Sequence, residues 1–296
     1  MPLLSRRAAL LLGATQLAPA IAASAQYDPG ADDHQILVGN TAPYSGPASA
    51  WATSAKAMAA VFAQVNAEGG ILGRRIRLLS RDDGYNPART VEQVRRLVED
   101  DAVLLMLAPL GTAQNAAIQA YLNDRGVPQL FINSGASRWG DPQRFPWTMG
   151  FTPSYRTEGR AYGLHIRASQ PQARVAVLYQ NDDLGRDYLQ GITDGLGPQG
   201  ASRLIAHSHE VTDATVDSQV LAMKAAGADA FINVSGPKFA AQAIRRAGEA
   251  GWRPAQYLAT ISNSLAAVLR PAGVEHARGI VSAVYLRDPS DPAVQA

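Results

Sequence analysis

The chain has 296 residues, of which 47% are hydrophobic and 18% are charged, a composition that is typical of globular proteins and excludes wholesale disorder. Its formal net charge is only +2, which argues against a nucleic-acid-binding protein that works through a basic face. The sequence has no cysteine, so disulfides, thiolate metal sites, cysteine nucleophiles and the cysteine-linked anchor of a lipoprotein are all excluded.

The first 25 residues have the features of a secretory signal peptide. Arg6 and Arg7 precede an apolar stretch, and small residues near the end of the segment predict cleavage before Gln26. A membrane anchor is the alternative, but polar residues and Pro19 interrupt the apolar run. The arginine pair leaves both the general secretory route and the twin-arginine route open. Cleavage would leave 25 basic and 25 acidic residues, and we expect a soluble periplasmic protein.

The remaining chain alternates short apolar runs with amphipathic stretches. Strands separated by single helices predict parallel sheets with right-handed crossovers. A break rich in turn residues at 140–155 predicts two α/β lobes with Rossmann-like parallel sheets rather than one continuous sheet. The expected strands are 36–39, 75–81, 103–107, 129–132, 174–179, 204–207, 229–234, 257–259 and 280–284, and the expected helices are 54–68, the segment capped by Asn86, 113–123, 157–169, 184–196, 216–226 and 237–250.

Two of these elements carry specific predictions about burial. The first helix has Met58, Val61, Phe62 and Val65 at the spacing of an amphipathic helix, which predicts that they form its buried face. The run 103–107 is continuously apolar, as expected for a strand that is covered on both sides of a sheet.

Motifs for enzymatic chemistry are missing from the sequence. It contains no phosphate-binding Gly-Lys-Ser/Thr loop, no G-x-G-x-x-G dinucleotide fingerprint and no G-x-S-x-G nucleophile elbow. His207 and His209 stand two apart on an expected strand and could face the same side, but no third metal ligand is near except Glu210, which would face the other way. We therefore expect neither a cofactor nor a metal site.

Acidic pairs and polar loops follow several of the expected strands. Asp82-Asp83 and Asp182-Asp183 could be catalytic at the carboxyl edge of a parallel sheet, although capping of the next helix is the favoured role for the second pair. The loops 110–112 and 133–137 offer hydroxyl and backbone N–H groups that could hold a carboxylate without a basic side chain. The alternative is that both loops are ordinary turns.

These segments together resemble the leucine/isoleucine/valine-binding protein family, the type I periplasmic binding proteins of ABC transporters. The resemblance extends from Asp33 to about Asp291. It implies two lobes with a hinged, ligand-binding cleft, with an N-terminal lobe at 26–151 joined by 282–296, and a C-terminal lobe at 152–281. The most specific match is the stretch NAEGGILGRRI at 66–76, accompanied by Ser45-Gly46-Pro47, Trp51, Asp82-Asp83, Asn86-Pro87, Asp182-Asp183-Leu184-Gly185 and Gly227-Ala228-Asp229.

The resemblance also implies which residues contact the ligand. In the first lobe, loop hydroxyls and backbone groups would hold a ligand carboxylate, and an aromatic side chain would cover the ligand. The residues at these positions are Trp51, Leu110, Thr112, Gly135, Ala136 and Ser137, and the second lobe would contribute Leu184, Gly236 and Ile261.

The second lobe departs from the family pattern. Leu184 stands where the family's amino-acid binders have a tyrosine, an aromatic residue is missing near Gly236, and Ile261 falls where an acidic residue holds the ligand's ammonium group. No Asp or Glu lies between Glu249 and Glu275, and a buried ammonium group without a carboxylate partner is costly. We therefore hypothesise that the ligand is a small branched or aromatic organic acid rather than an α-amino acid.

The expected function is that of the periplasmic substrate-binding component of an ABC transporter, a monomer that carries a small carboxylate ligand to a membrane permease. A ligand-sensing receptor domain of the same fold and an exported α/β enzyme are the alternatives. Family members continue beyond the position of Asp288-Pro289, so the last crossover and the closing helices are expected to be absent here. Apolar surface should be exposed as a result.

Overall fold

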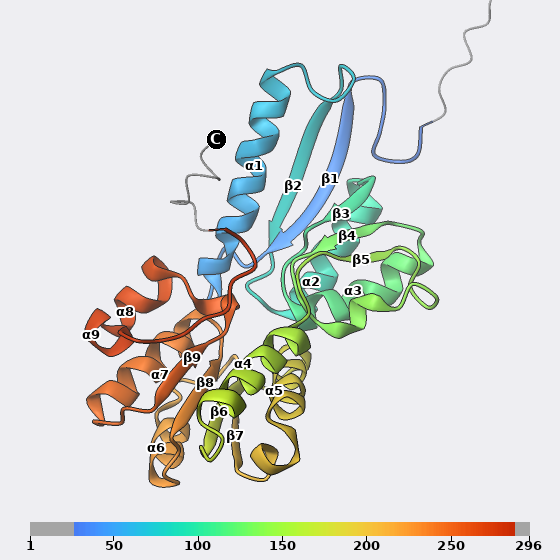
Figure 1. The fold of residues 1–296 in the computed structure, drawn as a ribbon. Helices are drawn as coiled ribbons and strands as arrows, with labels where there is room; N and C mark the ends of the chain where they lie inside the picture. Colours follow the sequence, from blue (N-terminus) through green and yellow to red (C-terminus); the bar gives the residue numbers. More distant parts are fainter. Residues whose placement is uncertain (1–26, 288–296) are drawn as a thin grey trace, which may run out of the picture.

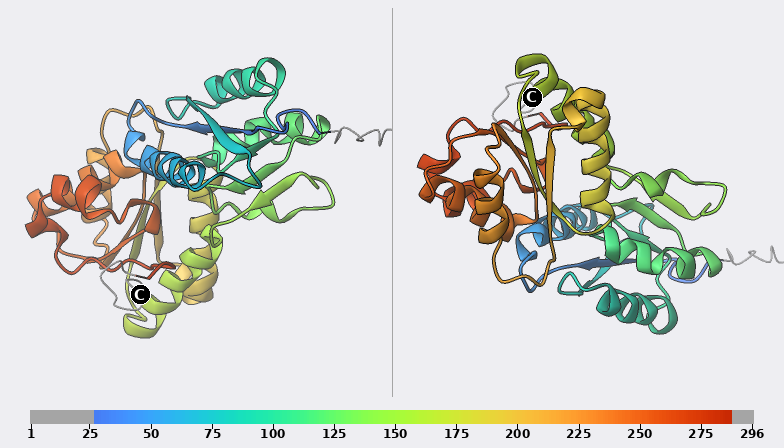
Figure 2. Two further views of the ribbon diagram at one scale, coloured as in Figure 1. Left: turned by 90° about the horizontal axis from the view of Figure 1, so that it is seen from above. Right: turned by 90° about the horizontal axis from the view of Figure 1, so that it is seen from below.

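The computed structural model describes residues 27–287, so the expected signal peptide and most of the expected returning segment 282–296 lie outside the described residues. The strands form two separate sheets, and every pair of neighbouring strands is parallel. Each sheet belongs to its own lobe (Figure 1), and the lobes remain distinct when viewed from above and from below (Figure 2). The predicted α/β architecture is confirmed.

The first lobe contains five strands in the order β2-β1-β3-β4-β5. The Asn86 side chain caps α2 by accepting from the backbone N–H groups of Ala88 and Arg89, as predicted. The three-residue β5 was missed because it carries no periodic pattern. The elements are β1 (Gln35–Ala42), α1 (Thr53–Ala67), β2 (Arg75–Asp82), α2 (Pro87–Arg95), β3 (Leu105–Leu107), α3 (Thr112–Asp124), β4 (Gln129–Ile132) and β5 (Thr148–Gly150).

The second lobe contains four strands in the order β7-β6-β8-β9. All five residues of β8 are buried, because helices pack on both faces of this sheet (Figure 1). The elements are α4 (Tyr155–Ser169), β6 (Val175–Gln180), α5 (Asp183–Ala201), β7 (Leu204–His209), α6 (Asp217–Ala225), β8 (Ala230–Val234), α7 (Pro237–Glu249), β9 (Ala255–Leu258), α8 (Arg270–Ala272) and α9 (Val274–Ala277).

The prediction of a strand at 280–284 is wrong. Only an isolated bridge joins Val281 to Tyr257 in β9. Beyond it, the backbone of Ala283 bonds to side chains instead of to a ladder: its N–H donates to the Tyr162 hydroxyl, and its carbonyl accepts from the Thr260 hydroxyl. The apolar run 280–284 is therefore an irregular segment that side chains of the second lobe hold in place through hydrogen bonds.

The two burial predictions for the first lobe hold only in part, because Met58, Phe62 and Val65 are half-buried but other residues are not covered. Val61 is 55% exposed, and Met106 is the only buried residue of β3. One side of this sheet instead borders an apolar groove of about 420 Å³, lined by Met58, Leu107, Phe131 and Phe151 among others. The predictions assumed a second covering layer, whereas no element within residues 27–287 fills this groove.

Helices α4 and α5 lie side by side (Figure 1) and make the most extensive contact between any two elements among residues 27–287. Two pairs of glycines, spaced four residues apart on each helix, allow this closeness. A Cβ added to Gly191 would lie 2.1 Å from the carbonyl oxygen of Arg156, and one added to Gly159 would lie 2.4 Å from that of Tyr188. The corresponding atoms at Gly163 and Gly195 would also overlap the facing backbone. The helix backbones therefore touch with no side chain between them.

Candidate functional site

A cavity of about 240 Å³ lies between the two lobes. Its walls come mainly from segments that follow the carboxyl ends of the strands, which is where open parallel sheets bind ligands. The first lobe contributes Trp51, Ser54, Leu110 and Asn133, the connection between the lobes contributes Thr152 and Pro153, and the second lobe and its returning chain contribute Tyr155, Glu158, Leu184, Thr260, Ile261 and Tyr285.

Four of the residues expected from the sequence line this cavity: Trp51, Leu110, Leu184 and Ile261. The indole Nε1 of Trp51 donates to the carbonyl oxygen of Ile261 at 2.7 Å, a hydrogen bond that joins the two lobes. Gly236 lies behind the same indole, because a Cβ added there would be 3.3 Å from the Trp51 ring. Trp51 thus forms a wall that both lobes support.

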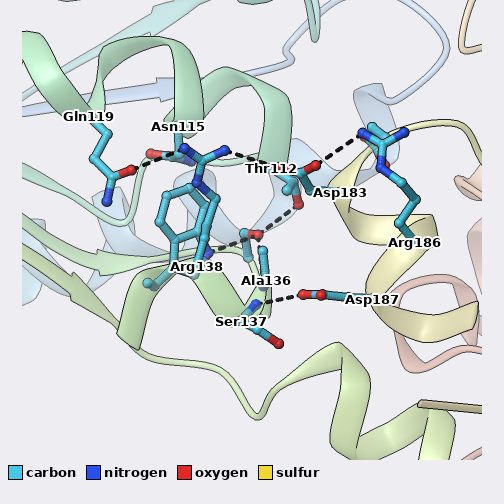
Figure 3. Close-up of polar contacts among 12 residues, drawn as sticks. Thr112, Asn115, Gln119, Ala136, Ser137, Arg138, Asp183, Arg186 and Asp187 are labelled. Atoms are coloured by element: carbon cyan, nitrogen blue, oxygen red, sulfur yellow. Dashed lines mark hydrogen bonds and ion pairs between the residues drawn. The ribbon is translucent and has the colours of Figure 1, made fainter. Parts of the chain in front are cut away.

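The expected carboxylate-binding groups in the first-lobe loops are engaged by other protein groups. The hydroxyl of Thr112 is fully buried and lies 2.7 Å from the hydroxyl of Ser134. The backbone N–H of Ser137 donates to Asp187 Oδ2 at 2.6 Å (Figure 3). Neither Thr112 nor Ser137 lines the cavity.

The remaining two expected residues lie behind Tyr155. A Cβ added to Gly135 would be 2.8 Å from the Tyr155 ring, and Ala136 is buried beside it. Burial raises the pKa of the Tyr155 phenol, while contacts with the Gly135 backbone, Ser134 and Thr112 act in the opposite direction. Tyr155 itself lines the cavity, so it stands where the sequence suggested that loop atoms would face a ligand.

Glu158 is a cavity residue that the sequence analysis missed. Its Oε1 accepts from the backbone N–H of Thr260 at 2.8 Å, and its Oε2 accepts from the Tyr188 hydroxyl at 2.7 Å. The Tyr162 hydroxyl also lies 2.8 Å from Oε1 and shares its proton between this oxygen and the carbonyl oxygen of Leu258. We refer to Glu158, Tyr162, Tyr188 and Thr260 as the Glu158 cluster.

The tyrosines of the Glu158 cluster remain protonated donors at neutral pH. Burial and the nearby negative charge of Glu158 raise the pKa values of both Tyr162 and Tyr188 well above the ordinary range. The only sequence signal was the spacing of Glu158 and Tyr162, four residues apart on one helix. Tyr188 and Thr260 are distant from Glu158 in the sequence, and only the folded chain brings them to its carboxylate.

Acidic residues near the start of α5 connect the second lobe to the segment 137–138 of the first lobe. Asp182 caps α5 by accepting from the Gly185 N–H, which confirms the capping prediction for this residue, whereas the Asp183 carboxylate pairs with arginines instead. Asp183 forms ion pairs with Arg138 at 2.9 Å and Arg186 at 3.0 Å (Figure 3). Burial acts to raise the pKa of Asp183, but its contacts with Arg186 and Arg138 outweigh burial and lower this pKa below its ordinary value.

The two histidines considered as metal ligands are used differently. His209 is buried, and its Nε2 lies 3.0 Å from the hydroxyl of Ser235. His207 is half-buried on the same strand. Residues 27–287 contain no group of three His, Asp or Glu side chains suited to a metal ion.

His209 should make stability depend on pH. Burial lowers its pKa below the ordinary value of 6.5, so the unfolded chain binds the proton first as the pH falls. The folded state therefore loses stability below about pH 6.5, by up to about 1.4 kcal/mol per pH unit until the folded-state pKa is reached. Urea unfolding at pH 7.5 and 5.5 should show a smaller pH dependence for His209→Gln than for the wild type. Equal dependences would contradict this role.

Among the helices of residues 27–287, none combines the length and the apolar character needed to cross a bilayer. Comparison with protein families finds one matching model, described as "Periplasmic binding protein", over residues 35–296. Among curated proteins, the Leu/Ile/Val-binding protein homolog 7 of Brucella abortus (strain 2308) is 22% identical over 227 residues, which are 74% of this chain and 57% of that protein. The chain thus spans less than two thirds of this relative.

Solved structures share the fold at low sequence identity. A fatty acid ABC transporter substrate-binding protein from Thermomonospora curvata has a TM-score of 0.74 and 20% identity, covering 87% of this chain and 65% of that one. A branched-chain amino acid transporter substrate-binding protein from Streptococcus pneumoniae, in complex with isoleucine, has a TM-score of 0.72 and 18% identity, covering 84% and 70%. The same fold therefore occurs in proteins whose names refer to different ligands.

Proposed function

This chain belongs to the periplasmic binding protein family, a family of solute-binding proteins and not of enzymes, and from that premise we propose that it is the periplasmic substrate-binding component of an ABC transporter. Its ligand is a branched-chain amino acid or a related small organic carboxylate, possessing an apolar body. It is exported by the signal at residues 1–25, acts as a monomer and delivers its ligand to an inner-membrane permease.

The observation that carries this proposal is the cavity of about 240 Å³ whose walls come from both lobes. A site shared by two lobes is the arrangement in which hinge closure encloses a ligand. The lobes we propose are residues 26–151 and 152–281, with the segment from 282 crossing back. Tyr285 on that segment lines the cavity, so the returning chain takes part in the site.

The cavity surface suits a ligand with a compact apolar part. Trp51, Leu110, Leu184 and Ile261 provide apolar walls, while Ser54 and Asn133 provide polar groups. The Asn133 amide donates to the hydroxyl of Ser54 at 3.1 Å, which leaves other hydrogen-bonding positions on both side chains for a ligand. Such a mixture of apolar walls and few polar groups is typical of small-molecule sites.

Calorimetric titration tests the proposed function. The full chain without its signal should bind at least one of leucine, isoleucine, valine or a panel of small branched and aromatic acids saturably. A ligand present at 100 times its Kd should stabilise the folded state by about 2.7 kcal/mol, which thermal unfolding would detect. The proposal would be wrong if none of these compounds produced either binding heat or a rise in melting temperature.

A further inference from the structure

We propose that Glu158 is the charged anchor of the cavity and recognises an ammonium group, so that the ligand is an amine-bearing molecule such as an α-amino acid rather than a simple organic acid. This inference rests on the proposed function and specifies its ligand class. The sequence around Ile261 has no acidic residue that could pair with an ammonium group. The inference assigns this role to Glu158 on α4 instead.

The charge of the cavity wall supports this assignment. Of the described residues that line the cavity, Glu158 is the only one with a carboxylate side chain, and none is basic. A second carboxylate, Asp182, is half-buried nearby and contributes to the raised pKa of Tyr155, a cavity residue. An anionic ligand without a compensating cation would place like charges together away from water, which is unfavourable. An ammonium group would instead pair with Glu158.

The geometry of the Glu158 cluster leaves the carboxylate able to accept one more donor. Oε1 is contacted by the Thr260 N–H and the Tyr162 hydroxyl, whereas Oε2 is contacted only by the Tyr188 hydroxyl. A carboxylate has about four acceptor positions in total, so one position on Oε2 remains. The three protein contacts fix the carboxylate before a ligand arrives, which lowers the ordering cost of binding.

The carboxylate of a zwitterionic ligand has a donor available in the same cavity. Thr152 lines the cavity, and its hydroxyl is buried without a hydrogen-bond partner among residues 27–287. A buried hydroxyl that lacks a partner is unfavourable, and a ligand carboxylate would satisfy it. An amine and a carboxylate on one small ligand therefore both find complementary groups.

Three probes with the same apolar body test the assignment on the wild-type chain without its signal. These are L-leucine, 3-methylbutylamine, which lacks the carboxylate, and 4-methylpentanoate, which lacks the ammonium group. Titration calorimetry should show that leucine binds at least about tenfold more tightly than 4-methylpentanoate. Detectable binding of 3-methylbutylamine, again tighter than that of 4-methylpentanoate, is also expected.

The variant Glu158→Gln removes the charge while keeping an amide oxygen that can accept from Tyr162 and Thr260. We expect it to weaken binding of leucine and of 3-methylbutylamine at least about tenfold and to leave 4-methylpentanoate unchanged or bound more tightly. Glu249→Gln is the matched control, because Glu249 is exposed at the end of α7 in the same lobe, and it should bind all three probes as the wild type does.

The outcomes separate this inference from the proposed function. Binding of 4-methylpentanoate as tight as that of leucine to the wild type would overturn the inference but leave the proposed function standing. Unchanged leucine binding by a folded Glu158→Gln variant would do the same. Because the wild-type comparison needs no variant, the inference stays testable even if Glu158→Gln fails to fold. Binding of none of the three probes would overturn both this inference and the branched-chain ligand.

Discussion

Replacing Gly191 by alanine should destabilise the protein, although the same change stabilises an ordinary helix. Alanine is favoured over glycine within a helix by about 0.5–1 kcal/mol. At Gly191, however, the new methyl group would lie 2.1 Å from the carbonyl oxygen of Arg156 on α4. Overpacking of this kind costs about 1–3 kcal/mol and sometimes more, and here the obstacle is rigid backbone. We expect a net loss of about 2 kcal/mol, or roughly 4–8 °C in melting temperature.

The sign of the change makes this prediction specific. Gly140→Ala is the matched control, because no heavy atom lies within 4 Å of a Cβ added there and the residue does not have a positive φ. The control should melt within about 2 °C of the wild type. A more stable Gly191→Ala protein in urea or thermal unfolding would contradict the close contact of α4 and α5.

Replacing Trp51 by alanine should weaken ligand binding more than any other single truncation in the first-lobe wall. The indole lines the cavity, packs against Tyr85 at a ring-centroid distance of 5.2 Å and donates to the carbonyl of Ile261. Loss of an aromatic anchor at the centre of a binding surface costs about 2–4 kcal/mol, which corresponds to a roughly 30- to 1,000-fold weaker Kd. Titration calorimetry with leucine would measure the change.

Two further variants separate the contributions of Trp51. Trp51→Phe keeps much of the apolar wall but removes the hydrogen bond to Ile261, and it should show an intermediate loss of affinity. Trp147→Ala is the control, because Trp147 is 45% exposed and does not line the cavity. If Trp51→Ala bound leucine as tightly as Trp147→Ala does, the cavity between the lobes would not be the binding site.

Periodicity and capping predicted most of the fold, because local signals determine most of these elements. Asn86 and Asp182 cap helices where the sequence indicated, and the alternation of strands and helices predicted parallel sheets. Periodicity failed where burial depends on a distant layer. Val61 was predicted to be buried from its spacing on α1, yet its side chain faces solvent because helical spacing cannot say whether another element covers that face.

The candidate site was predictable only in part, for a similar reason. Trp51 and Ile261 line the cavity as the family resemblance implied. Glu158 was missed because its partners Tyr188 and Thr260 are 30 and 102 residues away in the chain. The sequence around Ile261 has no carboxylate, and nothing in it indicates that α4 brings Glu158 to the same cavity.

Contacts that join the two lobes directly imply that the affinity for a ligand can change without a change in the residues that touch the ligand. The hydrogen bond from Trp51 to Ile261 and the ion pair Arg138–Asp183 both join the lobes through protein atoms alone. Both therefore favour an arrangement with the lobes closed together before any ligand contributes. Apparent affinity is the intrinsic affinity of the closed form multiplied by the fraction of molecules that adopt it. A substitution at Arg138 or Asp183, neither of which lines the cavity, would therefore change the apparent affinity of the protein without altering which ligand it selects.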